Sequence, residues 1–432
     1  MTLLAWLAVL DLVAVVVLTA LRVDVRLTLL LGAAALFAVD GGAGMAEMTA
    51  KVAAEMANAA TVVPIGSALG FAYVMRLTGC DRELVRLLLR PLRLAPALLV
   101  PGGVAAGYLV NTTIVSQTGA AAVLGPILIP LLRAGGLDAV TAGATLLLGA
   151  SMGGELFNPG AVEMRKLSDL TGLEGYDVVS RQAPLNFTAC GAALLTFWLL
   201  AWRRSRTAES TSCPEAEPDE SRVNPFKAAI PVAPLAILFA DGALGSASPL
   251  VAFEGPSTIL AAMLIGVLLA WLAAPRAGRR LAAEFFDGAG YAYTHVISLI
   301  VTASTFAEGV RRSGLIEVVV RKLAERPALA PMASAALPWA LGVIGGSGIA
   351  PAVAVMEFFV PAADVLGLDP VRIGALASLG AHFGRTMSPA AAVVAMCARL
   401  SGEPGLRLIR AVAPPLLIGM AVMIAATVLG AV

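Results

Sequence analysis

Long apolar runs alternate with short polar segments along almost the whole chain. A helix needs about 20 apolar residues to cross a hydrocarbon core of roughly 30 Å. Several runs approach or reach that length, and this pattern predicts helices that span a membrane. The clearest of them are residues 3–21, 183–202, 230–244, 258–274 and 406–429.

The composition excludes a soluble domain. Hydrophobic residues make up 59% of the 432 residues, charged residues only 14%, and the mean hydropathy is +0.86. The net charge of +1 gives no sign of nucleic-acid binding, because the basic residues lie singly or in small groups at the ends of apolar runs. Four scattered cysteines have neither disulfide nor metal-site spacing. We therefore predict an all-α polytopic protein whose main partner is the lipid bilayer, with no cofactor.

One polar stretch divides the chain into two parts. Residues 203–226 combine Arg203, Arg204 and Arg206 with an acidic, proline-containing segment, a composition typical of an extramembrane linker. It separates a first membrane unit, residues 1–202, from a second one, residues 227–432.

The second unit repeats part of the first. A shift of 231 positions aligns residues 116–153 with 347–384 without a gap. Pro130 meets Pro361, and Gly-Leu-Asp at 136–138 meets the same tripeptide at 367–369. The alternative is that sequence rich in Ala, Gly and Leu matches itself by chance. The matched Pro, Asp and Ser argue against that alternative. We predict two repeats.

Basic residues predict that the two repeats are inverted. Arg22 and Arg26 follow the first apolar run, whereas the equivalent loop of the second unit, residues 241–256, contains no Lys or Arg. After the second run the order reverses, with no basic residue in 40–48 and three between Arg276 and Arg280. Short cytoplasmic loops collect Lys and Arg, so the units are predicted to have opposite orientations, as in many secondary transporters.

Interruptions rich in Gly, Pro and polar residues occur in matched pairs. One pair is 111–119 and 345–351, and the other is 151–160 and 381–389. Broken or re-entrant helices in transporters form binding sites near the middle of the membrane, where unwound backbone is shielded from lipid. We therefore expect the site at these four places.

The first pair offers hydroxyl and amide groups. These suit hydrogen bonds to a carboxylate or ligation of sodium, with the sodium expected near Asn111, Ser116 and Ser347. The alternative is that they only help helices to pack. The predicted substrate-binding residues of this pair are Asn111, Thr112, Thr113, Ser116 and Ser347.

The second pair carries opposite charges, Glu155 and Arg385. An ionisable side chain within a span costs about 2.5 to 3.5 kcal/mol on insertion scales, so a functional role is expected. Arg385 is predicted to bind a substrate carboxylate with its planar fork. Glu155 is a cation ligand, a proton carrier or only the partner of Arg385. His382 is a candidate for proton coupling or a structural histidine.

Three further polar residues of the same breaks complete the predicted substrate site: Asn158, Thr386 and Ser388. Two other segments, 80–93 and 313–326, place basic residues among leucines and valines at helical spacing. Each predicts an amphipathic helix at the membrane surface.

Three runs carry a resemblance to a known family: residues 111–118 (NTTIVSQT), 149–160 (GASMGGELFNPG) and 345–351 (GGSGIAP). They resemble the anaerobic four-carbon-dicarboxylate carriers of the Dcu C type, within the broader ion-transporter superfamily, and the resemblance covers about residues 61–401. That superfamily marks its site with paired Ser-Asn-Thr motifs. Here Val110-Asn111-Thr112 and Gly345-Gly346-Ser347 take their places, a departure that concerns sodium coupling more than carboxylate binding.

The resemblance implies a homodimeric secondary active transporter in a bacterial inner membrane. Each protomer would have a scaffold domain and a transport domain with two re-entrant hairpins, and would work by elevator-type alternating access. Succinate, fumarate or malate would be the substrates, driven by protons or sodium or exchanged. Exact substrate, coupling ion and direction stay open.

Other function classes fit the sequence less well. An anion channel would need polar residues along several spans instead of clustered breaks. An enzyme or an ATP-driven pump would need a metal cluster, a phosphate loop or a catalytic serine motif, and the sequence offers none. A cation/proton antiporter would centre on buried acids, and Glu155 is the only acid in a predicted break. A carrier of another carboxylate or of an amino acid is a further alternative.

Overall fold

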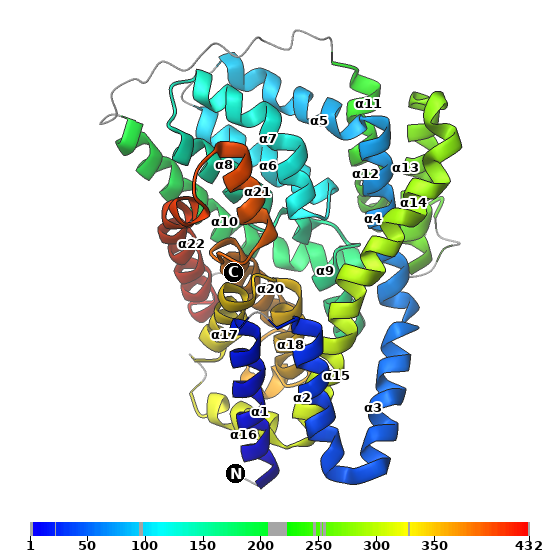
Figure 1. The fold of residues 1–432 in the computed structure, drawn as a ribbon, viewed down its shortest axis with the longest axis vertical. Coiled ribbons are helices and arrows are strands. Elements are labelled where there is room, and N and C mark those ends of the chain that lie inside the picture. Colours follow the sequence, from blue (N-terminus) through cyan, green and yellow to red (C-terminus); the bar gives the residue numbers. More distant parts are fainter. Residues whose placement is uncertain are drawn as a thin grey trace.

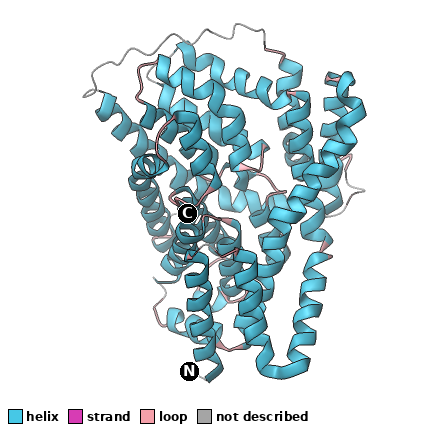
Figure 2. Ribbon diagram, in the orientation of Figure 1, coloured by secondary structure: helices cyan, strands magenta, loops and turns pink. Residues whose placement is uncertain are grey.

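The chain forms helices of very different lengths (Figure 1). The computed structural model describes residues 3–21, 23–94, 98–205, 223–244, 248–250, 253, 256–326 and 329–430. Within these ranges all regular structure is helical (Figure 2). The predicted linker 203–226 lies mostly outside the described residues, so the predicted domain division stays a prediction.

The helices of the first unit are α1 (Leu3–Ala20), α2 (Val25–Phe37), α3 (Gly41–Met56), α4 (Ala59–Thr78), α5 (Cys80–Leu89), α6 (Leu99–Thr113), α7 (Gln117–Ala134), α8 (Ala139–Ser151), α9 (Val162–Thr171) and α10 (Gly175–Ser205). Those of the second unit are α11 (Pro225–Ala229), α12 (Ala233–Leu244), α13 (Pro256–Ala273), α14 (Gly278–Ala292), α15 (Ser298–Arg312), α16 (Leu315–Ala324), α17 (Leu329–Gly345), α18 (Ile349–Phe359), α19 (Ala363–Leu366), α20 (Pro370–Thr386), α21 (Ala392–Ser401) and α22 (Gly405–Val428).

Six helical stretches among the described residues are long and apolar enough to cross a membrane. They are Ala59–Thr78, Gln117–Ala134, Ala139–Thr171, Gly175–Arg203, Pro256–Ala273 and Gly405–Val428. The predicted runs 3–21 and 230–244 are not among them: the first contains a shorter apolar helix, Leu4–Leu18, and the second divides into a 3-10 turn, Ile230–Val232, and the 12-residue helix α12. The all-α membrane fold is confirmed.

Helices stop at the predicted interruptions. Helix α6 ends at Thr113 and α7 begins at Gln117, and the matched loop lies between α17 and α18. Helix α8 ends at Ser151 and is followed by a 3-10 turn, Gly154–Phe157, before α9. The fourth interruption is shorter than predicted, since α20 continues to Thr386. The repeat of the two units and its inversion both stay predictions.

Two short amphipathic helices lie at opposite ends of the long axis. Helix α5 is at the top of the view and α16 at the bottom (Figure 1). Each follows a glycine with a left-handed backbone, Gly79 at φ 70° and Gly314 at φ 73°, which permits the sharp turn after the preceding helix. Both predicted amphipathic segments are therefore confirmed as helices.

Two pairs of helices form hairpins: α6 with α7 is the first hairpin, and α17 with α18 is the second. Backbone contacts through glycine hold the first hairpin against α8 and the second against α20. A Cβ atom built on Gly384 of α20 would lie 2.1 Å from the carbonyl oxygen of Trp339 in α17. In the first unit, a Cβ on Gly107 of α6 would lie 2.8 Å from the backbone of Gly149 in α8. Small residues allow such close approach of helices in membranes. One arm of each hairpin is thus fixed to the helix that ends beside its tip.

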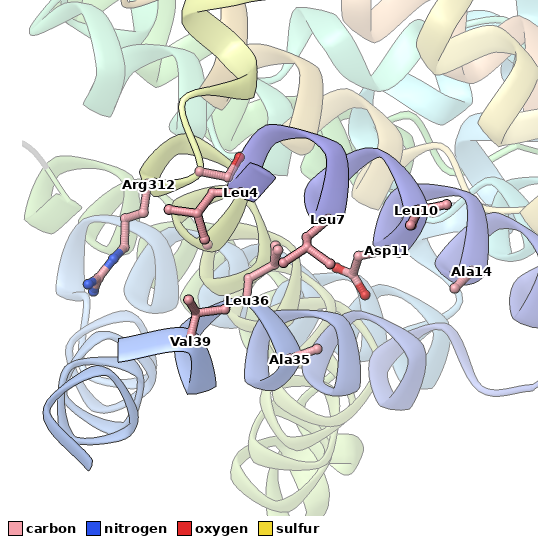
Figure 3. A pocket seen from close by; sticks show the side chains of 11 residues that line it. Leu4, Leu7, Leu10, Asp11, Ala14, Ala35, Leu36, Val39 and Arg312 are labelled. Carbon is pink, nitrogen blue, oxygen red and sulfur yellow. The ribbon is translucent and has the colours of Figure 1, made fainter. Parts of the chain in front are cut away.

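A cavity of about 550 Å³ lies between α1, α2 and the end of α15 (Figure 3). Most of its lining residues are apolar, and Asp11 points into it from the middle of α1. The Oδ2 atom of Asp11 is buried without a hydrogen-bond partner. A carboxylate in an apolar helix is costly, so this residue is expected to destabilise the fold.

We expect Asp11→Asn to raise the apparent melting temperature by about 1 to 3 °C, because it removes a poorly solvated charge. The measurement is thermal unfolding of the purified protein in detergent, together with transport in liposomes. Unchanged transport is expected. A large loss of transport would show that Asp11 is functional and contradict the prediction.

Candidate functional site

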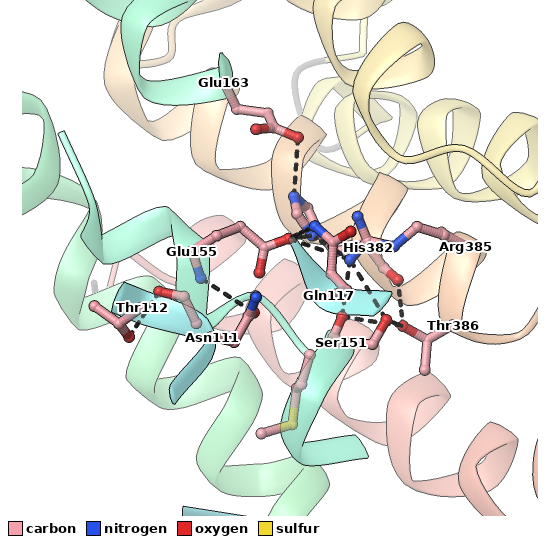
Figure 4. Close-up of polar contacts among 12 residues, drawn as sticks. Asn111, Thr112, Gln117, Ser151, Glu155, Glu163, His382, Arg385 and Thr386 are labelled. Carbon is pink, nitrogen blue, oxygen red and sulfur yellow. Dashed lines mark hydrogen bonds and ion pairs between the residues drawn. The ribbon is translucent and has the colours of Figure 1, made fainter. Parts of the chain in front are cut away.

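Side chains from four separate segments meet in one buried polar centre (Figure 4). They come from the two ends of the first hairpin loop, the broken segment after α8, the start of α9 and the last turn of α20. We call this group the polar centre; it consists of Asn111, Thr112, Gln117, Ser151, Glu155, Glu163, His382, Arg385 and Thr386.

Arg385 is the cation of the polar centre. It lies in the last turn of α20 and is only 5% exposed. Its Nη2 atom donates to the carbonyl oxygen of Ser151 at 3.1 Å and lies 3.3 Å from Glu155 Oε1. A Cβ built on Gly348 would lie 3.0 Å from Nη1, so the guanidinium group also lies against the second hairpin. Arg385 therefore contacts both the broken segment after α8 and the second hairpin loop.

Two glycines allow the break that carries Glu155. Gly153 has φ 117°, which an L side chain rarely adopts, and a Cβ on Gly154 would lie 2.3 Å from the carbonyl oxygen of Tyr108. The 3-10 turn that follows points Glu155 into the protein, where it is 1% exposed. The local backbone thus depends on glycine for steric reasons.

Glu155 has several partners but keeps one free oxygen atom. Its backbone N–H donates to Asn111 Oδ1 at 3.3 Å, and its Oε1 atom accepts from the side-chain amide of Gln117. The same Oε1 atom faces Arg385 and His382. The Oε2 atom is buried without a hydrogen-bond partner. An unpaired buried carboxylate oxygen is costly, and it could accept from a bound donor or ligate a cation.

His382 lies between two carboxylates. Its Nδ1 atom is 3.0 Å from Glu155 Oε1, and its Nε2 atom is 3.1 Å from Glu163 Oε1. All three side chains are almost fully buried. Arg385 also meets the imidazole, with Nη2 2.8 Å from Nδ1. Histidine is therefore in direct contact with all the other charged groups of the polar centre.

Asn111, Thr112 and Asn158 join the first hairpin to the broken segment. Thr112 Oγ1 donates to the carbonyl oxygen of Gly154 at 3.0 Å. Asn158 Nδ2 donates to the carbonyl oxygen of Thr112 at 3.1 Å. Thr386 similarly donates to the carbonyl oxygen of Ser151 at 3.1 Å. In this conformation these predicted substrate-binding groups hydrogen-bond to the protein backbone.

Five predicted residues lie outside the polar centre: Asn158, which borders it as described above, and four others. Thr113 donates to the carbonyl oxygen of Val110, and Ser116 caps α7 by accepting from the N–H of Gly119. Ser388 accepts from the N–H of Ala390 in its own turn. Ser347 is partly exposed in the second hairpin loop. The sodium site expected near Asn111, Ser116 and Ser347 stays a prediction.

Sequence analysis missed Gln117, Ser151 and Glu163 as site residues. Gln117 lies in the predicted interruption 111–119 and Ser151 in 151–160, so both could have been predicted as site residues from their polar side chains. Glu163 follows the break by one helical turn, in a charged stretch that resembles an ordinary polar helix. Its role depends on packing of α9 against α20, which the sequence does not reveal.

A small cavity of about 30 Å³ borders the polar centre. Gln117, Glu155 and Glu163 line one side of it, while α4 and a π-helical turn, Tyr293–Ile297, supply apolar residues of the other side. Such a volume holds about one water molecule. A four-carbon dicarboxylate is larger than this cavity.

Residues 43–432 match the C4-dicarboxylate anaerobic carrier family, DcuC. The chain belongs to this family. The carrier is accordingly a membrane transport protein and not an enzyme, as predicted.

Individual relatives of the carrier are distant. It is 28% identical to an uncharacterised transporter of Haemophilus influenzae over 61% of this chain and 97% of the relative. It is 22% identical to the anaerobic C4-dicarboxylate transporter DcuC of Escherichia coli K12 over 83% of this chain and 78% of the relative.

Two solved structures share the carrier's fold. The YdaH transporter of Alcanivorax borkumensis has a TM-score of 0.63 at 16% identity, covering 90% of this chain and 88% of that one. MtrF of Neisseria gonorrhoeae, from a class of antimetabolite efflux pumps, has a TM-score of 0.58 at 14% identity, covering 90% and 84%. At these identities the likeness extends to the fold alone.

Proposed function

We propose that the protein is a secondary active carrier of small organic anions, with four-carbon dicarboxylates such as succinate, fumarate and malate as its substrates. The observation that supports this most is the buried Arg385, which lies between the broken segment after α8 and the second hairpin loop. A guanidinium fork binds carboxylates bidentately. The family description and the E. coli relative's name support the dicarboxylate as the cargo.

The proposed mechanism is elevator-type alternating access in two inverted repeats. The hairpins and broken helices would form a transport domain, and α4 with the helices packed on it, α13 and α14, part of the scaffold. The amphipathic helices α5 and α16 would lie at the two membrane surfaces as arms and would allow the transport domain to move. A homodimer in the bacterial inner membrane is proposed as the working form, as the family resemblance implies.

A coupling cation, a proton or sodium, would balance the negative charge of the cargo. Glu155 and His382 are the proposed coupling residues, because both contact Arg385. The second buried acid, Glu163, is an observation that favours an alternative function, a cation/proton antiporter. Exchange of an organic anion distinguishes the two, since an antiporter of cations does not carry it.

The test is succinate counterflow in proteoliposomes. Vesicles loaded with unlabelled succinate should accumulate labelled succinate from outside, and malate and fumarate should compete. Protein-free vesicles are the control. If no organic anion exchanges but protons exchange against sodium or potassium, the antiporter replaces the proposed function.

A further inference from the structure

The Nδ1 atom of His382 faces two partners with opposite requirements. Arg385 Nη2, which can only donate a hydrogen bond, lies 2.8 Å away. Glu155 Oε1, which accepts when ionised, lies 3.0 Å away. A ring nitrogen with a proton fits Glu155, and one without a proton fits Arg385. The protonation of this atom therefore decides which of the two neighbours it binds.

The other ring nitrogen has one partner. His382 Nε2 lies 3.1 Å from Glu163 Oε1, and both side chains are nearly inaccessible to solvent (Figure 4). An ionised carboxylate requires a proton on Nε2. Glu163 thus fixes the tautomer that leaves Nδ1 free to gain or lose a proton, as a hydrogen-bonded carboxylate does for a catalytic histidine.

Few other charges act on this imidazole. Within the described residues, the charged groups that face it are Glu155 from the broken segment, Glu163 from α9 and Arg385 from its own helix. Lys166, a cation on the same helix as Glu163, is paired with Glu357 of α18 and donates to Ser304 of α15. The charge balance around His382 therefore depends mainly on three side chains.

We propose that Glu163 is a positioning residue for proton coupling, and that His382 gains a proton on Nδ1 when Arg385 turns to the cargo. This inference rests on the proposed function and names the proton as the coupling ion. Without cargo, Arg385 donates to the neutral imidazole and to Glu155. A bound carboxylate withdraws the guanidinium from both.

Proton uptake then restores the hydrogen bonds that the cargo has broken. The proton added to Nδ1 bonds to Glu155, while Glu163 keeps its bond to Nε2 and now faces an imidazolium. Cargo and proton thus favour each other's binding, and this coupling is reciprocal by thermodynamic linkage. Release of the cargo returns Arg385 to Nδ1 and expels the proton.

The experiment compares wild type, Glu163→Gln and Glu163→Asp in proteoliposomes. Two properties are measured: succinate counterflow at equal pH, and uphill uptake driven by an imposed pH gradient over a range of external pH. Counterflow needs no net proton transfer. In Glu163→Gln, gradient-driven uptake should fall at least tenfold more than counterflow does.

The pH profile gives a readout that a purely structural role would not change. The pH of half-maximal counterflow should fall by about one unit in Glu163→Gln, because an opposite charge beside the imidazolium is lost. Glu163→Asp, which keeps the charge, should restore most of the wild-type profile. Glu55→Gln is the matched control, since Glu55 is a buried glutamate paired with Lys51.

A second assay measures protons directly. Succinate added to purified protein in weak buffer should remove close to one proton per bound anion in wild type and clearly fewer in Glu163→Gln. If Glu163→Gln does not fold, His382→Gln takes its place, with counterflow expected to become independent of pH.

The outcomes distinguish failure of this inference from failure of the proposed function. A wild type that carries succinate with the same pH profile and gradient response as Glu163→Gln overturns this inference alone. So does uphill uptake that follows a sodium gradient and ignores a pH gradient. A wild type that exchanges no organic anion overturns the proposed function and this inference with it.

Discussion

Replacement of Arg385 by alanine is expected to lower succinate counterflow by about 100-fold or more. The guanidinium is buried, and loss of one partner from a buried charge pair typically costs about 2 to 5 kcal/mol, where 1.4 kcal/mol is tenfold. Arg385→Lys keeps the charge but not the planar fork and should retain about a tenth of the rate or less. The measurement is initial counterflow rate at several succinate concentrations.

A double variant separates cargo binding from simple charge balance. Arg385→Ala alone leaves Glu155 buried without its cation, which destabilises a fold strongly. Arg385→Ala combined with Glu155→Gln removes that charge too, so its thermal stability should return towards wild type. Transport should stay low. If the double variant transports succinate well, Arg385 only balances Glu155, and the assignment to the cargo fails.

Gly384→Val is expected to disrupt both folding and transport. A Cβ atom at this position would lie 2.1 Å from the carbonyl oxygen of Trp339, and backbone cannot rotate away as a side chain can. Helices α17 and α20 would have to separate, at a cost of about 3 kcal/mol or more. Arg385 follows directly in sequence, so any remaining folded protein should carry succinate at least tenfold more slowly.

The matched control for that variant is another helical glycine. Gly191 lies within α10, and a Cβ built on it meets nothing within 4 Å. Gly191→Ala should therefore be neutral or stabilising by up to about 1 kcal/mol, as in other helix interiors. Thermal unfolding and size-exclusion profiles of both variants give the comparison. A Gly384→Val protein as stable as wild type would show that the contact is not tight.

Much of the fold could be predicted because its causes are local. Apolar runs of spanning length identify a membrane protein whatever their packing. The ends of α6 and α17 fall within the predicted interruptions, where polar residues or glycine replace the apolar pattern. The predicted break at 381–389 begins too early. Gly384 lies in the predicted break, but it packs against the backbone of α17 and stays helical, as Gly380 does.

The polar centre could be predicted only in part. An arginine and a glutamate in matched breaks indicated a site, because ionisable groups in apolar surroundings are rare. Glu163 could not be recognised in the same way. Its contact with His382 joins residues 219 positions apart and depends on how α9 packs on α20. Likewise, only the fold shows that Ser116 caps its own helix while Gln117 points to Glu155.

The positions of α5 and α16 have a consequence for the membrane around the protein. They lie at opposite ends of the long axis, and each carries an apolar face and a charged face. In the proposed mechanism both helices lie at lipid surfaces, so their separation must match the thickness of the bilayer. Mismatch costs a fraction of a kcal/mol per ångström, which tilts or distorts such elements. The lipid acyl chains therefore become part of what sets the resting position of the two hairpins.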